Sequence, residues 1–216
     1  RPETFSRSFE VRGSMEAVSE AFISPEINGQ IRELAVSRGQ TVQKGDLLVR
    51  LNTDVTEKSI EEIRTSLELA RKVFEKQEEL WEKQIGSEIQ YLEARNNVES
   101  LEARLATLQK QLELAEIKAP FKGIIEDIMV KQGELASPGM PMLHLVNLDR
   151  MRIRAQISES YLNSVARVDL VEVRFPSYPE MILKEPISRL GEVIDAQTRT
   201  FSLEVELNNP SEKLKP

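Results

Sequence analysis

Two stretches of this sequence repeat each other and decide its fold: GQIRELAVSRG at residues 29–39 and GIIEDIMVKQG at residues 123–133. They lie at an offset of 94 residues, the distance from Gly29 to Gly123, and the register continues beyond them. The matching pairs are Gly29 and Gly123, Gly39 and Gly133, Gly45 and Gly139, Ile31 and Ile125, Val36 and Val130, and Leu51 and Leu145. Between the glycines, both copies have the pattern of short strands separated by turns that need glycine conformations. Each copy is therefore predicted to be half of one small β module.

The segment between the copies, residues 55–116, contains one glycine and no proline, which favours continuous helix broken once. Apolar residues follow alternating steps of three and four on both sides of Gly86, as in a coiled-coil seam. They are Ile60, Ile63, Leu67, Ala70, Phe74 and Trp81 in the first arm, with Gln77 as a polar interruption, and Tyr91, Ala94, Val98, Leu101, Leu105, Leu108, Leu112 and Ala115 in the second. The pattern predicts an antiparallel helical hairpin that turns at Gly86, with arms of about 30 residues, roughly 45 Å long.

The ends of the predicted arms carry helix signals. Asp54 with Glu57, and Ser87 with Gln90, fit capping boxes, and Pro120 stops the second arm. The charged outer faces of the hairpin are expected to be solvated.

The last third of the chain alternates apolar and polar residues at residues 151–157, 171–175 and 201–207. Such alternation predicts strands with one buried face, and several of them with short connections predict a small closed barrel. The predicted organisation is N-terminal strands of the barrel or a membrane-proximal region at 1–22, half of the module at 23–53, the hairpin at 54–117, the second half at 118–147 and the barrel at 148–216. The fold class is α+β, with several modules in an elongated chain.

Composition excludes several classes of function. The chain has 29 Lys+Arg against 36 Asp+Glu and no dense basic run, so nucleic acid is not an expected partner. Cysteine is absent, which removes disulfides, thiolate metal sites and cysteine nucleophiles. No apolar run reaches the roughly 20 residues that cross a bilayer. The chain begins at Arg1 and ends on a turn-like proline, Pro216, so we expect the natural protein to continue and its membrane anchor to lie outside this sequence.

A β module in two halves, interrupted by a coiled-coil hairpin and followed by a barrel, resembles the periplasmic adaptors (HlyD-like membrane fusion proteins) of resistance-nodulation-division (RND) tripartite efflux pumps. The resemblance rests on residues 25–31, 39–48, 117–123 and 195–200 and covers nearly the whole chain. It implies that the split module is a lipoyl-like (barrel-sandwich hybrid) domain. It also implies two membrane partners, an inner-membrane transporter and a TolC-type outer-membrane channel, and self-association into a ring, typically of six copies. The implied location is the periplasm, anchored to the inner membrane through a lipid or a helix.

The resemblance places the channel contact at the hairpin tip. The family pattern of Arg, then Leu four residues on, then Ser seven further falls on Lys76, Leu80 and Ser87, where the lysine keeps the positive charge but not the planar fork of arginine. Each residue also has a structural interpretation: Ser87 as a helix cap, Leu80 as hairpin packing, and Lys76 as a solvated charge.

No enzyme and no cofactor is predicted. His144 is the only histidine and lies in a strand-like run, so the chain has no second histidine for a metal or serine-type arrangement, and a structural role is expected. Only Met140 and Met142 are close together among six methionines, and they are expected to pack in a turn and a strand. The carboxylates of a solvated helix have no desolvated pocket in which to act as acids or bases.

Three other functions compete with the RND adaptor. An adaptor of an ATP-driven exporter or a type I secretion system shares the same plan. A lipoyl or biotinyl carrier domain would need a lysine at the turn joining the halves, where the chain reads Leu51-Asn52-Thr53-Asp54-Val55. A purely structural coiled-coil protein leaves the split repeat unexplained.

Overall fold

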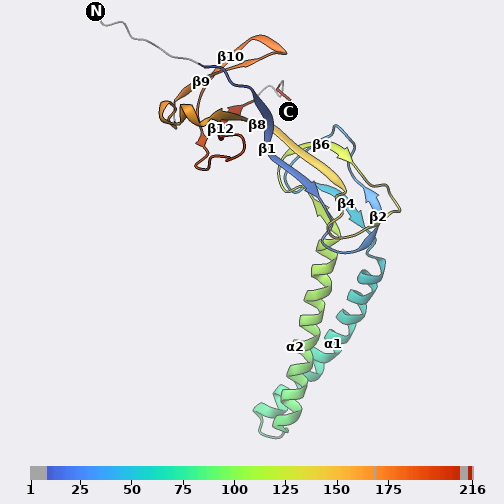
Figure 1. The fold of residues 1–216 in the computed structure, drawn as a ribbon. Coiled ribbons are helices and arrows are strands. Elements are labelled where there is room, and N and C mark those ends of the chain that lie inside the picture. The colour runs from blue at the N-terminus through green and yellow to red at the C-terminus, as the bar shows by residue number, and fades with distance from the viewer. Residues whose placement is uncertain (1–8, 168, 210–213, 216) are drawn as a thin grey trace, which may run out of the picture. The chain divides into compact units, whose positions relative to one another are not determined.

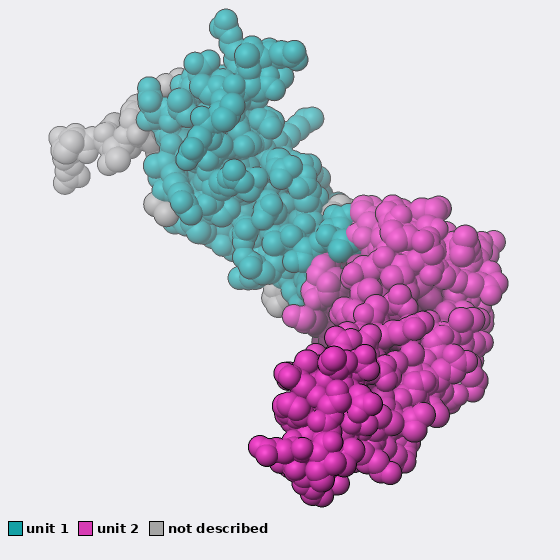
Figure 2. All heavy atoms as spheres, turned by 90° about the horizontal axis from the view of Figure 1, so that it is seen from below, with its two compact units in different colours: residues 1–21, 146–216 teal, residues 22–145 magenta. Residues whose placement is uncertain are grey.

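The computed structural model describes residues 9–167, 169–209 and 214–215, and the chain divides into two compact units (Figures 1 and 2). Unit 1 comprises residues 1–21 and 146–216, and unit 2 comprises residues 22–145. Strands β1 (Gly13–Ile23) and β8 (Leu143–Ser158) run from one unit into the other.

Unit 2 contains the two repeats as two sets of strands. The first repeat forms β2 (Gly29–Leu34), β3 (Thr41–Val42) and β4 (Leu47–Leu51). After the hairpin and strand β5 (Glu116–Lys118), the second repeat forms β6 (Gly123–Ile128), β7 (Leu135–Ala136) and the start of β8.

The repeats are interlocked, because strands of one half pair with strands of the other. Gly29 of β2 lies opposite Ala136 of β7, and Gly123 of β6 lies opposite Val42 of β3, which is the same pairing shifted by the repeat. The backbone hydrogen bonds repeat as well: the Ile31 amide donates to the Glu134 carbonyl (2.8 Å) and the Ile125 amide to the Gln40 carbonyl (3.0 Å). Neither half can complete its sheets alone, so the halves must fold together.

The six glycines of the repeat have two different roles. Gly39, Gly45, Gly133 and Gly139 have positive φ angles of 80–93° and occupy turns, as predicted. Gly29 and Gly123 were also expected in turns, but they are the first residues of β2 and β6. A Cβ on Gly29 would lie 3.1 Å from a methyl carbon of Leu51, so close packing rather than turn conformation requires the glycine.

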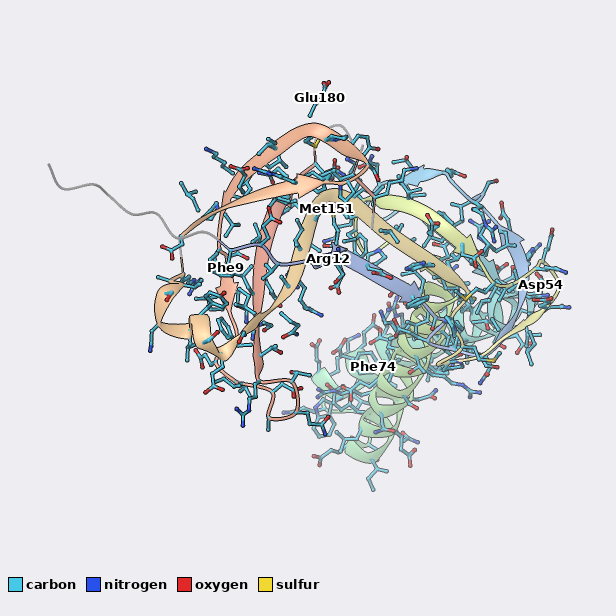
Figure 3. The ribbon with its side chains drawn as sticks, turned by 45° about the horizontal axis from the view of Figure 1, so that its top comes forward. Phe9, Arg12, Asp54, Phe74, Met151 and Glu180 are labelled. Carbon is cyan, nitrogen blue, oxygen red and sulfur yellow. The ribbon has the colours of Figure 1, made fainter. Side chains whose placement is uncertain are left out.

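The hairpin consists of α1 (Asp54–Glu82) and α2 (Glu88–Leu114), which lie side by side in Figure 1. The predicted seam is the contact surface: Ile60, Ile63, Leu67 and Ala70 are buried. Phe74, labelled in Figure 3, lies 5.7 Å from Tyr91 of the other helix, ring centroid to centroid. The helical segment ends at Leu114, before the predicted 117, because Glu116–Lys118 pairs with β4.

Neither predicted capping box forms. Thr53, not Asp54, is the N-cap of α1, and its hydroxyl donates to the Glu57 carboxylate (2.6 Å). Ser87 is the N-cap of α2, as predicted, but its side chain makes no cap hydrogen bond.

Unit 1 is built on β8 and its antiparallel partner β12 (Thr200–Asn208), with β11 (Arg189–Leu190) beside β12. β9 (Leu170–Phe175) and β10 (Tyr178–Pro186) pair with each other and pack on the same core. Met151, labelled in Figure 3, belongs to this core together with Ile157, Ile187, Phe201, Leu203, Val205, Leu207 and Leu214. The described N-terminal residues provide one strand, β1, which pairs with β8, whereas several strands were predicted.

The segment 195–200, one of those that suggested the resemblance, forms a tight turn before β12. The Asp195 carboxylate accepts hydrogen bonds from the backbone amides of Gln197 (2.8 Å) and Thr198 (3.0 Å). These bonds lower the pKa of Asp195, because they favour its ionised form.

Candidate functional site: the hairpin tip

The end of α1 shapes the hairpin tip. The Gln84 amide donates to the Trp81 carbonyl (2.9 Å) and the Ile85 amide to the Leu80 carbonyl (3.0 Å). These two bonds define a Schellman ending, which satisfies carbonyls that the helix leaves without partners. The ending needs a residue in the left-handed region, and here that residue is Gln84, with φ of 58°.

Gly86 was predicted as the turning residue, but its role is spatial. Its φ angle is not in the left-handed region. A Cβ at this position would lie 3.2 Å from the Leu80 Cβ and 3.3 Å from the Trp81 nitrogen. Gly86 therefore lets the chain cross close over the end of α1, while Gln84 reverses its direction.

The structure brings Leu80, Gly86 and Ser87 together at the tip. The Leu80 carbonyl accepts backbone hydrogen bonds from Ile85 and Gly86. Ser87 follows Gly86 directly and is the exposed N-cap of α2. Lys76 precedes Leu80 by four residues and therefore shares its face of α1, about 9 Å before the end of the helix.

Sequence reasoning missed the most exposed apolar side chains at the tip. Ile85 is 74% exposed and Ile89 67%, compared with 39% for Leu80 and for Trp81. Trp81 stacks on Tyr91 with 6.1 Å between ring centroids. The sequence does carry a signal for this exposure: Ile85 and Ile89 fall outside the coiled-coil seam, at positions where a solvated helix should be polar. The tip thus presents an apolar surface that the hairpin itself does not cover.

Along the rest of the hairpin, the solvated faces carry ion pairs. Glu68 pairs with Lys72 (2.7 Å) and Arg95 with Glu99 (2.8 Å) within one helix, while Arg71 pairs with Glu102 (2.6 Å) across the two. The hydrogen bond from Lys72 lowers the pKa of Glu68. All six side chains are exposed to solvent, so each ion pair contributes little to stability.

The turn that would present a carrier lysine is used to start α1. Asn52 accepts a hydrogen bond from the Asp54 amide (3.0 Å), and Thr53 caps the helix. Asp54, labelled in Figure 3, is already helical. The nearest lysine, Lys58, lies on α1, where its hydrogen bond to Glu61 (2.9 Å) raises its pKa.

Of the remaining candidates, His144 lies in β8 and Met142 directly before it, whereas the expected packing of Met140 is wrong because its side chain is exposed. His144 stacks on Phe22, with 4.4 Å between ring centroids, and Met142 is fully buried, whereas Met140 is 61% exposed. Among the described residues, no three His, Asp or Glu side chains gather as they would around a metal ion. No helix formed by the described residues is both long and apolar enough to span a membrane.

Comparison with known protein families agrees with this architecture. Residues 58–114 match the family described as CzcB-like, alpha-helical hairpin domain. Residues 152–216 match the family described as CusB-like, beta-barrel domain.

Individual relatives align over most of the chain. The nodulation protein NolF of Rhizobium meliloti is 26% identical over 211 residues, which is 91% of this chain and 58% of the relative. The cobalt-zinc-cadmium resistance protein CzcB of Cupriavidus metallidurans is 25% identical and matches 91% of this chain. The chain spans 58% and 40% of the lengths of these two relatives.

A solved structure shows the same fold. The crystal structure of a MacA–MexA chimera, which contains the α-hairpin domain of Pseudomonas aeruginosa MexA, superposes with a TM-score of 0.85. It is 21% identical, and the match covers 94% of this chain and 76% of the chimera.

Proposed function

Because this chain belongs to the membrane fusion proteins, the periplasmic adaptors of RND efflux systems, we propose that it links an inner-membrane RND transporter to a TolC-type outer-membrane channel. The proposed cargo is a drug or another toxic compound, and the proposed location is the periplasm, held to the inner membrane by a lipid or helical anchor. The role is mechanical bridging, without catalysis or a cofactor.

The tip of the hairpin is the observation that supports this proposal most directly. A two-helix projection buries one seam, and a free tip has no reason to be apolar unless another surface covers it. Ile85 and Ile89 are largely exposed; Ser87 lies between them in sequence, and Leu80 accepts the backbone hydrogen bond that Ile85 donates. We assign the channel contact to Lys76, Leu80 and Ser87, as the family pattern suggests, and add Ile85.

The interlocked β module supports the other part of the proposal, a ring of several copies. Each half of the module completes the sheets of the other half. The helices α1 and α2 are therefore attached to a module whose two halves pair strand to strand. A module paired in this way can act as a fixed base that keeps the hairpin tip in position. We propose that several copies, six in the family pattern, form a ring through these modules, with the hairpins as a bundle.

Photocrosslinking in cells tests the docking role. A photoreactive residue at Leu80 or Ser87 of the full-length protein should capture an outer-membrane channel, and the same residue at Arg64 should not, because Arg64 is exposed on α1 far from the tip. Capture from Leu80 should disappear when residues 83–87 are replaced by a plain turn. An exported, folded protein that captures no channel from either tip position would refute the docking role.

A further inference from the structure

A groove lies at the base of the hairpin, where the C-terminal end of α2 joins the β module (Figure 1). Its volume is about 430 Å³, and all of its lining residues belong to unit 2. Three segments form it: the end of β1 with the residues that follow it, the last turns of α2, and β5 with Pro120. Binding sites for small organic molecules commonly have volumes of about 300–1,000 Å³, so the groove has room for one such molecule.

Apolar side chains line the groove on all three segments. Ile23 and Ile117 are buried, and Leu114 is half-buried. Phe22, by contrast, is 58% exposed, and its ring stacks on His144 with 4.4 Å between ring centroids. Because the stack holds the ring in one orientation, Phe22 presents a fixed aromatic surface to the groove.

The charged lining residues fall into two groups, of which the first is balanced. At β5, Glu116 pairs with Lys118 (2.9 Å), and Arg50 also reaches it (3.5 Å). The negative charge of Glu116 is therefore already matched by two cations of the chain.

The second group, at the end of α2, has an excess of negative charge, because two carboxylates share one lysine. Lys110 pairs with Glu113 (3.0 Å). The hydrogen bond to Glu113 raises the pKa of Lys110, and the nearby charge of Glu26 adds to this effect. The last turn of α2, Gln111–Leu114, contains no basic residue, so the partial negative charge of the helix end is not offset there. This side of the groove therefore favours a cation.

We propose that the groove binds a lipophilic organic cation, whose apolar body lies on Phe22 and Ile117 and whose charge lies beside Glu26 and Glu113. The ring of Phe22 suits such a ligand in two ways, because an aromatic face attracts both flat apolar groups and positive charge. The inference deepens the proposed function, on which it rests for the step from binding to export. It names the class of cargo as amphipathic cations.

A pair of ions of opposite charge tests the proposal. Tetraphenylphosphonium is the probe, and tetraphenylborate, which has nearly the same shape and a negative charge, is its control. Binding of each ion to the purified chain is measured by isothermal titration calorimetry. We expect the cation to bind several-fold more tightly than the anion, and Phe22→Ala to weaken binding of the cation several-fold. No binding of the cation, equal binding of the two ions, or cation binding that Phe22→Ala leaves unchanged would overturn the inference.

Carboxylate variants test the charge independently of the apolar surface. The double substitution Glu26→Gln with Glu113→Gln changes two exposed side chains, so the chain should keep its fold, which circular dichroism checks. The double variant should lose the preference for the cation. Glu75→Gln with Glu79→Gln, an equal change at exposed positions of α1 far from the groove, should keep it. A preference for the cation that survives in the groove variant would contradict the site.

The groove and the adaptor role can fail separately, because channel capture from Ser87 is scored in a different experiment. A protein that captures the channel but whose purified chain binds no cation would retain the adaptor role and lose the groove. Cation binding without channel capture would support the groove and refute the docking role.

Discussion

Truncation of one seam residue, Leu67→Ala, should destabilise the hairpin, whereas the same change two residues later, Leu69→Ala, should not. The side chain of Leu67 is buried in the seam, with 6% exposure of the residue, while Leu69 is 66% exposed on the same helix. The two substitutions remove the same atoms and change helix propensity equally. Their difference therefore measures the burial of the seam.

The expected magnitude follows from the removed atoms. Leu→Ala deletes three carbons, and at about 0.8 kcal/mol per buried CH₂ the lost transfer free energy is about 2.4 kcal/mol. A residual cavity adds to this, within a range of about 2–5 kcal/mol for buried leucines. Because the hairpin has two helices and no third layer, its neighbours can close partly around the gap, so we expect about 2.5–3 kcal/mol. For Leu69→Ala we expect a change within about 0.5 kcal/mol.

Urea unfolding followed by tryptophan fluorescence is the assay, since Trp81 is the only tryptophan and stacks on Tyr91 inside the hairpin. Its signal reports the hairpin even if the two units unfold separately. Far-UV circular dichroism of the helices should show the same transition. Equal losses for the two variants, or no loss for Leu67→Ala, would refute the seam as the source of hairpin stability.

Three further predictions concern local structure. Gln84→Gly should stabilise the hairpin by about 0.5–1 kcal/mol in the same urea assay, because Gln84 has a φ of 58° that glycine adopts without strain; a loss of stability would contradict the Schellman ending. Asp195→Asn should lower the melting temperature of the barrel at pH 7, and the difference should vanish in acid. The backbone bonds lower the pKa of Asp195 below its ordinary value of 3.8, so the ionised group stabilises the fold above that value and its contribution is lost as the pH falls through the folded-state pKa; a difference that persists in strong acid would exclude this cause. Glu204→Ala should cost about 1–3 kcal/mol in thermal melting followed by circular dichroism, because Glu204 is 8% exposed beside Arg152 and Arg154, whose charges would lose their buried partner. Glu172→Ala, which removes a more exposed carboxylate from β9, should be nearly neutral and is the matched control.

The sequence by itself determined the features that repeat at fixed spacing. The offset between Gly29 and Gly123 predicted two equivalent half-modules, and steps of three and four predicted both helices and their seam. Each follows from local geometry: a helix places every third or fourth residue on one face, and certain turns require positive φ, as at Gly39 and Gly133. Such rules need no knowledge of distant residues.

The tertiary structure decided what depends on distant neighbours. Gly29 is a glycine because Leu51 packs against it, and Gly86 because the chain crosses the end of α1, although both look like turn residues in the sequence. The cross-pairing of the halves and the burial of Glu204 likewise appear only when separate segments meet. An apolar residue in a sequence specifies a preference for burial but not its partner, and at the hairpin tip the fold leaves that preference unmet.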